Sequence, residues 1–576
     1  MSSSIPRLVP YHKLAQFMAS IDTGYLGSVR ETFCEDLEDE EKVDGAFRDI
    51  VQFLPLLASF YMKIEQQTGE KLLWFDKENT FKVILGGDGA PFGKYDTSCS
   101  WLVSFLNRGR HVLSSDENFL IFGANCGEES LPVRRYVQKL VSDIAIVERS
   151  VYIVDNSEIR FEFAELPNDL KMLAFLAGEL PVSAKYFSTF GSVNTDDYTD
   201  IKGTYGSKME NKWKPWKYGD RLKFAKAVKA QKGKLEKQKI AESTKRSKLT
   251  SFIAQQKHRQ EFEPLIGPLI DRAHIDTLHC KNNACQQIFK QLLTEAVGKS
   301  KLPENISKFS SVPSSCTFAK FVGCLKAKAR MGRLAKNIVR WFNESKASGK
   351  SFEYRFTGQD SRLLMHHFMF IIEALEQEND SEMQTFHLHL LAFVLLELRE
   401  STALFCRVRT DELQIEQLQI HCSNVYRAMV IFRSITPTLW NIGHVIPSHA
   451  LDVYNKYALG LGVLSMEGRE AKHQAIANYN RNTQYKHRWQ QIFQHEFIQL
   501  IWLRERGYFV EDNNTYKGKY VPDRTKEAGY CFCGLDKESN NKHCRYCSHH
   551  FRSQIIASVK AGKNCTNIFN RGAKKF

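Results

Sequence analysis

The sequence feature that most constrains the fold is a series of short apolar runs that begins near residue 80. Runs of roughly four to eight apolar residues, bounded by turn-forming residues, are typical of buried strands. Three of them come in succession, followed by a segment with helical spacing, an extended segment and a second helix. In chain order these segments are 81–85, 100–106, 119–124, 131–150, 151–166 and 169–180. The order predicts a mixed sheet flanked by helices, which is an α+β fold.

The segments on either side of this region are predicted to be mostly helical. Residues 1–78 mix apolar and charged side chains at helical spacing. Residues 263–455 show the same spacing over long stretches, such as TFHLHLLAFVLLELRESTALF, with no strand pattern. Around residues 511–529 the chain becomes polar, which predicts a linker before the C-terminal residues.

The composition excludes several classes of protein. The sequence contains no run of about 18 apolar residues, so no membrane span and no membrane partner are expected. Its first residues lack the apolar stretch of a signal peptide. The 14 cysteines of a chain without a secretion signal favour reduced thiols and metal sites over disulfides. We therefore expect an intracellular protein.

The formal net charge of +15 is concentrated in one segment. Between residues 202 and 259 there are 18 lysines and arginines against four acids, a net of +14. Such a density of cations can neutralise phosphates and release counterions, so we interpret residues 202–262 as a basic DNA-binding segment. A solvated basic linker is the alternative. The lysines around 226–248 would also act as a nuclear-localisation signal.

Aromatic residues are interleaved with these cations. Trp213, Trp216 and Tyr218 could stack on bases or clamp the DNA backbone, and they could equally anchor the segment in a core. Both interpretations stay open at this point. The candidate DNA-binding residues of the segment are Lys212, Lys214, Trp216, Lys217, Arg221, Lys223 and Lys226.

Three acids stand at positions that suit a shared metal site. Asp88 follows the first apolar run, Asp169 precedes a helix, and Glu470 lies in the segment GLGVLSMEGREAKHQ. Each also has a purely structural interpretation: a turn residue before glycine, a helix N-cap, and a surface glutamate, respectively. Their joint occurrence favours a site. Glu467 lies one helical turn before Glu470 and is the alternative third acid.

Three segments together resemble the catalytic core shared by the V(D)J recombinase catalytic subunit and the Transib transposases. They are FKVILGGDGAPFG, FEFAELPNDLKMLAFLAGEL and GLGVLSMEGREAKHQ, and a fourth stretch, HIDTLHCKNNACQQIFKQLL, is similar to the family's Leu-His-Cys segment. The resemblance runs from about residue 81 to 500. It implies an RNase H-like catalytic domain in two parts, 79–201 and 456–510. Residues 263–455 would then be an all-helical insertion, as in hAT-type enzymes.

The resemblance also implies the chemistry. Asp88, Asp169 and Glu470 would be the catalytic acids of a DNA transposase and would bind Mg²⁺ (or Mn²⁺). Carboxylates that converge on one point can hold two divalent ions about 3.5–4 Å apart for phosphodiester transfer. The enzyme would bind terminal inverted repeats, nick one strand and attack the other with the freed 3′-hydroxyl, giving hairpin ends.

Further expectations come with this family. Such enzymes commonly act as homodimers on double-stranded DNA in the nucleus, and residues 1–78 would serve DNA binding or dimerisation. Within the insertion, Trp341 could stack on a displaced base beside Arg340, or it could be a core residue. The chief rival interpretation is a domesticated, catalytically silent DNA-binding protein of the same fold.

A pair of histidines bears on a possible zinc site. In V(D)J-type enzymes a His-x4-His pair before the catalytic glutamate shares zinc with a Cys-x2-Cys motif. The pair is present here as His444 and His449, but Ser188 and Gly191 stand where the cysteines would be. Packed core histidines are therefore the alternative. Cys280 or Cys285 could substitute as ligands, although nothing in the sequence indicates it.

The C-terminal tail gives a sharper zinc signal. Two closely spaced thiol pairs are the usual way to build a tetrahedral zinc site. We therefore interpret residues 511–576 as a linker and a zinc-binding tail with a structural Zn²⁺. Its candidate ligands are Cys531, Cys533, Cys544 and Cys547.

Overall fold

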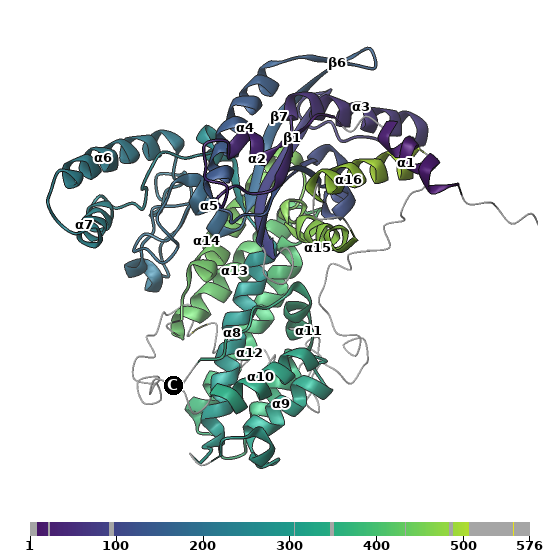
Figure 1. Cartoon of the computed structure of the whole chain (residues 1–576). Coiled ribbons are helices and arrows are strands. Elements are labelled where there is room, and N and C mark those ends of the chain that lie inside the picture. Colours follow the sequence, from purple (N-terminus) through teal and green to yellow (C-terminus); the bar gives the residue numbers. More distant parts are fainter. Residues whose placement is uncertain are drawn as a thin grey trace, which may run out of the picture.

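At the centre of the chain an eight-stranded mixed sheet stands on a long column of helices (Figure 1). The computed structural model describes residues 9–20, 24–91, 97–303, 306–345, 351–432, 434–482, 488–505 and 557. Along the sheet the strand order is β1-β2-β5-β4-β3-β7-β6, and β8 also pairs with β7. The α+β class expected from the sequence is therefore confirmed.

The central strand β3 has one antiparallel neighbour, β4, and one parallel neighbour, β7. β4 runs antiparallel to β3, with Asp88 opposite Ser100, and β5 runs antiparallel to β4. β7 lies on the other side of β3 and runs parallel to it, and β8 runs parallel to β7. The bounds are β3 Thr80–Pro91, β4 Thr97–Phe105, β5 Phe119–Ala124, β6 Tyr152–Val154, β7 Ser157–Asn168 and β8 Ala273–Ile275.

The N-terminal region differs from the helical expectation. Its strands β1 (Leu26–Ser28) and β2 (Gly45–Arg48) extend the same sheet, because β2 pairs with β5. Strands of three and four residues are too short to show alternation in the sequence. The helices of the region are α1 Tyr11–Ser20, α2 Val29–Phe33 and α3 Ile50–Thr68.

Both faces of the sheet are covered, because successive side chains of a strand point to opposite faces. Trp101 and Val103 of β4 pack against α3 and α4 (Leu131–Arg149), whereas Leu102 between them faces the other side. There it meets Trp489 and Phe493 of α16. The two helices of that face are α15 Glu467–Asn482 and α16 Arg488–Glu505.

The column below the sheet consists of helices α8 to α14 (Figure 1). One continuous apolar core runs through it and reaches Ile84 of β3. The expectation of a helical segment without strands is wrong at β8, which is only three residues long. The bounds are α8 Thr277–Ser300, α9 Thr317–Ala327, α10 Gly332–Ser345, α11 Gly358–Leu375, α12 Glu382–Phe405, α13 Glu412–Ile431 and α14 Pro437–Tyr457.

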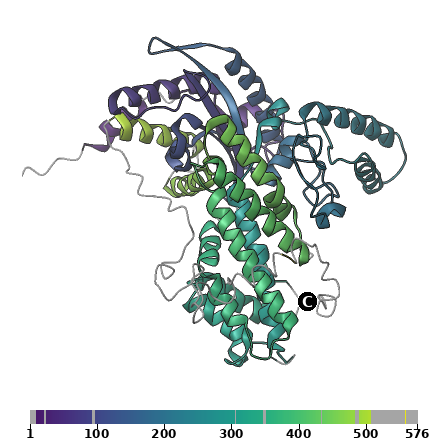
Figure 2. The ribbon, with the colours of Figure 1, turned by 180° about the vertical axis from the view of Figure 1, so that it is seen from behind.

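A helical hairpin projects sideways from the body. It consists of α6 (Tyr218–Glu236) and α7 (Glu242–Gln255), and both views show it extending beyond the sheet and the column (Figures 1 and 2). We call it the basic arm. It follows α5 (Leu170–Ala177) after an irregular segment.

Candidate metal centre

Asp88 lies in a buried position on β3. Its carboxylate Oδ1 accepts a hydrogen bond from the Gly89 N–H at 2.8 Å, and its side chain is 7 % exposed. Burial, followed by the charges of Glu470 and Asp169, raises the pKa of Asp88 well above its ordinary value. Acids gathered in this way repel one another unless a cation or a proton joins them.

The first turn of α15 brings Glu470 to Asp88. The Met466 N–H donates to Asp276 Oδ1 at 3.0 Å, which fixes the start of the helix. The Arg469 guanidinium is buried, donates to the Pro167 carbonyl at 3.0 Å, and lies where a side chain at position 86 would stand. Gly86 is therefore required for the close approach of α15 to β3. Because Arg469 is held against the sheet, the carboxylate of the next residue, Glu470, lies close to that of Asp88.

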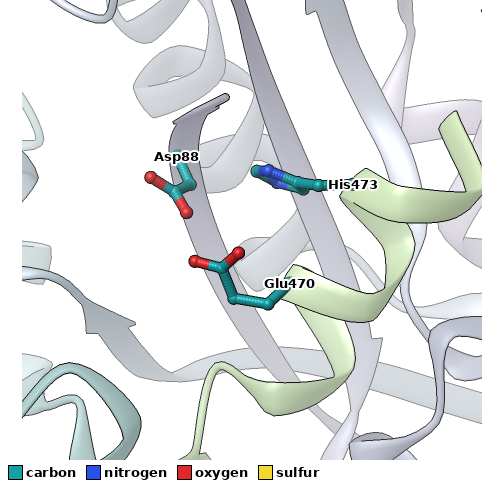
Figure 3. Close-up of side chains that lie close together, drawn as sticks. All are labelled: Asp88, Glu470 and His473. Atoms are coloured by element: carbon teal, nitrogen blue, oxygen red, sulfur yellow. The ribbon is translucent and has the colours of Figure 1, made fainter. Parts of the chain in front are cut away.

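Three side chains meet in the space between β3 and α15 (Figure 3). One ligand atom each of Asp88, Glu470 and His473 lies within 4.8 Å of the other two. Among the described residues this is the one group of three or more side chains of metal-binding type at such spacing.

Asp169 is near this group but outside it. Its Oδ1 accepts from the Met172 N–H at 2.7 Å, so the side chain caps α5, as the structural alternative expected. Its negative charge nevertheless raises the pKa of Asp88. Asp169 therefore caps α5 and also lies close enough to the candidate metal centre for its charge to act on Asp88.

A fourth carboxylate that no sequence motif indicated, Glu128, lies beside Asp88. It packs against Gly89, it forms an ion pair with Lys171 at 3.1 Å, and its charge adds to the rise of the Asp88 pKa. Glu128 lies in the turn between β5 and α4, where no motif marked it. Only the folded sheet shows that this turn is next to β3.

Two histidines were likewise not predicted from the sequence as site residues. His279, at the start of α8, has a carboxylate oxygen near each of its ring nitrogens. Nδ1 lies 2.5 Å from Asp276 Oδ2, and Nε2 lies 3.3 Å from Glu470 Oε1. Burial lowers the pKa of His279, but these two carboxylates outweigh it and hold the pKa well above its usual value. Burial also lowers the pKa of His473. The spacing Glu470-x-x-His473, which places both residues on one helix face, was the signal available for it.

The two histidines of the expected second zinc site occupy packed positions. His444 lies among the rings of Trp213, Tyr426 and Trp440, and burial lowers its pKa to about 3. His449 accepts from the Ile275 N–H at 3.2 Å. Among the described residues, neither belongs to a group of metal-binding type. The structure thus favours packed core histidines over zinc at this place.

The cysteines considered as substitute ligands are equally packed. Cys280 and Cys285 are buried in the apolar core of the column, and burial raises the pKa of both thiols. Ser188, at one expected cysteine position, accepts backbone N–H groups instead. The four tail cysteines, Cys531, Cys533, Cys544 and Cys547, lie outside the described residues.

The expectation for Arg221 as a DNA contact is wrong. Its guanidinium is buried, forms an ion pair with Glu179 and donates to the Thr189 carbonyl. Arg259 pairs with the same glutamate at 2.7 Å. A guanidinium enclosed in this way is not available to a phosphate. The positive charge of Arg221 instead anchors the root of the basic arm.

The other candidates of the segment divide into two groups. Lys212 pairs with Asp197 and Asp200 at 2.7 Å, and Lys214 donates to backbone carbonyls. Trp216 is half-buried and donates to the Ser188 carbonyl at 3.3 Å. Three further candidates lie on or beside α6 and are exposed, as Lys212 is: Lys217, Lys223 and Lys226.

The two candidates in the helical column also differ from each other. Arg340 on α10 is exposed and donates to Asn337 at 2.8 Å. Trp341 is half-buried and packs against the apolar core, and the centroids of its ring and the Phe352 ring are 5.6 Å apart. The core interpretation therefore fits Trp341.

No family model matches the chain, and no curated protein sequence matches it either. The helices in the described part of the chain include none long and apolar enough to span a membrane.

Proposed function

We propose that the chain is a divalent-metal-dependent DNA transposase or recombinase. The observation that carries the proposal is that Asp88 and Glu470, from distant parts of the sequence, meet between β3 and α15 with the charge of Asp169 close by. These are the three acids to which the resemblance to V(D)J-type and Transib enzymes assigns catalysis. The helical column between Asp169 and Glu470 is, in this proposal, the all-helical insertion.

The strand arrangement supports an RNase H-like catalytic domain. An antiparallel set, β5-β4-β3, is followed by the crossover helix α4 and by β7, parallel to β3. A crossover of this kind places the ends of two parallel strands next to each other. Asp88 near the end of β3 and Asp169 directly after β7 are therefore neighbours.

The donor set at the site suits a divalent cation. Asp88 and Glu470 would hold the ion through carboxylate oxygens, and Asp169 would add charge beside them. The buried His473 Nδ1 has no hydrogen-bond partner among the described residues, which also fits a site made for an ion. Bound Mg²⁺ or Mn²⁺ would supply activation of a water or 3′-hydroxyl and stabilisation of the leaving oxygen.

The basic arm supports DNA as the substrate. Its lysines are largely exposed, and no large apolar side chain of α6 or α7 is among the exposed hydrophobic residues of the described chain. A surface that is cationic without an apolar stripe suits phosphates better than a membrane interface. Binding of terminal inverted repeats, action as a homodimer, hairpin ends, a nuclear location and a Zn²⁺-binding tail belong to the proposal through the family resemblance.

The test is a cleavage assay on end-labelled DNA that carries the terminal inverted repeats of the transposon that encodes the protein. Wild type and Asp88→Ala are compared with Mg²⁺, with Mn²⁺ and with EDTA, and the products are separated on denaturing gels. Metal-dependent nicks or hairpins that are absent with Asp88→Ala would support the proposal. DNA binding without any cut, and without dependence on Asp88, would instead indicate a domesticated DNA-binding protein.

A further inference from the structure

His473 shares the metal centre with the two acids. It follows Glu470 by three residues on α15, and residues so spaced lie on one helix face. A ring nitrogen of His473 and carboxylate oxygens of Asp88 and Glu470 all lie within 4.8 Å of one another (Figure 3). When each bond is about 2.1 Å, two ligand atoms of one ion lie about 3.0 Å apart in adjacent positions and about 4.2 Å apart in opposite positions. A small closure would therefore let all three bind one ion.

The imidazole has little else to bind. His473 is 6 % exposed, and its Nδ1 has no hydrogen-bond partner among the described residues. Its Nε2 lies 3.5 Å from Ser100 Oγ, which is the outer limit of a hydrogen bond. Burial of a polar nitrogen costs free energy unless a partner compensates. A cation between the carboxylates is such a partner.

We infer that His473 is a nitrogen ligand of the cation held by Asp88 and Glu470, and that the site therefore favours Mn²⁺ over Mg²⁺. Mg²⁺ takes oxygen ligands almost exclusively, whereas first-row transition ions accept imidazole. Inward-facing Glu-x-x-His pairs on helices hold iron and manganese in carboxylate-type dimetal proteins. The inference rests on the proposed function only in taking the acid cluster as a metal centre.

The test measures metal binding by the full chain without DNA. Mn²⁺ is titrated and followed by electron paramagnetic resonance, and pulsed spectra of the bound ion are searched for coupling to a ¹⁴N nucleus. We expect the coupling in wild type and its loss in His473→Gln. The same change should weaken Mn²⁺ binding by at least about tenfold, while Mg²⁺, measured by competition, changes by less than about threefold.

Two control variants separate His473 from other histidines. His495 is exposed on α16, so His495→Gln should keep both the coupling and the Mn²⁺ affinity. His279→Gln should keep the ¹⁴N coupling, because His279 contacts the oxygen of Glu470. Asp88→Ala should abolish the coupled signal, which places the bound ion at this centre.

The wild-type spectrum decides the inference even if a variant fails to fold. Bound Mn²⁺ without ¹⁴N coupling would overturn it, as would coupling that persists in His473→Gln or Asp88→Ala. Coupled Mn²⁺ in a protein that cuts no DNA would uphold His473 as ligand and remove the proposed function. DNA cutting by a protein whose Mn²⁺ lacks the coupling would do the reverse.

Discussion

Lys281 Nζ lies 3.1 Å from a carboxylate oxygen of Glu467. The pair joins α8 to the first turn of α15 and gives the Glu467 carboxylate a cationic partner on α8. Glu470, three residues later, meets Asp88 instead. The sequence left both glutamates as candidates for the third acid, and this ion pair favours Glu470.

The first prediction separates the two glutamates by activity. Glu470→Gln should lower DNA cleavage by at least about 1,000-fold, because it removes a charged ligand at the point where negative charge develops. Glu467→Gln should keep cleavage within about threefold of wild type, since it breaks an ion pair with the buried Lys281 outside the metal centre and therefore lowers stability more than activity. Rates are measured on the same labelled DNA under single-turnover conditions. The reverse pattern would assign the third acid to Glu467.

The second prediction concerns the stability of the metal-free protein. Burial and the charges of Glu470 and Asp169 raise the pKa of Asp88. A carboxyl with a raised folded pKa favours folding at low pH, and this contribution is lost as the pH rises through that pKa. At pH 7.5 with EDTA, Asp88→Asn should therefore melt a few degrees above wild type.

Bound metal should reverse the order of the two melting temperatures, so that wild type melts above Asp88→Asn. Saturating Mn²⁺ should raise the melting temperature of wild type and leave Asp88→Asn nearly unchanged, because ligand binding to the folded state alone stabilises it. Glu158→Gln, at an exposed position of β7, is the matched control and should respond to Mn²⁺ as wild type does. If Asp88→Asn melts lower than wild type in EDTA, the acids are not in mutual repulsion.

The strands and helices between residues 80 and 180 were predictable because most of them are long enough to show the spacing of apolar residues that is typical of a strand or a helix. The apolar runs at 81–85 and 119–124 became β3 and β5, and the helical spacing at 131–150 became α4. Strands β1, β2 and β8 were not predictable. With three or four residues each, they depend on the neighbouring strands, which the local pattern does not reveal.

The candidate site was predictable in its acids but not in its other members. Asp88 and Glu470 could be named because their segments resemble a family core, but His473 had only a spacing to mark it. Arg221 was misassigned because charge density does not show which cations have buried partners. Its partner Glu179 lies outside the basic segment, so only the folded chain brings the two together.

The third prediction is a pH dependence of folding at the junction of α14 and β8. Burial lowers the pKa of His274, but Glu165 and Asp452 outweigh it and raise the pKa to about 9. Lys456 and His449 also face this imidazole, and the charge of Lys456 disfavours its protonation. Since the folded pKa exceeds the ordinary value of about 6.5, the stabilisation is complete below that value and is lost towards pH 9.

Chemical denaturation should reveal this loss. The free energy of unfolding of wild type should fall between pH 6.5 and pH 9, and His274→Gln should be less stable at pH 6.5 and nearly flat over the same interval. His495→Gln, at an exposed site, should retain the slope of wild type. A wild-type curve that is level over this interval would mean that His274 is neutral in the folded protein.

The fourth prediction concerns the exposed lysines of the basic arm. Lys229, Lys232 and Lys234 on α6 and Lys239 beyond it are exposed, whereas Lys212 and Lys214 near the root are engaged with acids and carbonyls. Each phosphate contact contributes about 0.9 to the slope of log K against log salt. Replacement of Lys229, Lys232, Lys234 and Lys239 by glutamine should therefore weaken DNA binding and reduce that slope by up to about 3.6.

The paired change Lys212→Gln with Lys214→Gln is the control, and it should leave the salt slope nearly unchanged. Mn²⁺ affinity should be equal in both variants, because the arm extends beyond the sheet on the side away from α15, which carries Glu470 and His473 (Figure 1). Fluorescence anisotropy on a labelled duplex between roughly 50 and 200 mM salt gives the slopes. If the control lowers the slope and the four-lysine variant does not, the root of the arm, rather than its exposed length, contacts the phosphates. Equal, unchanged slopes would mean that the arm does not bind DNA.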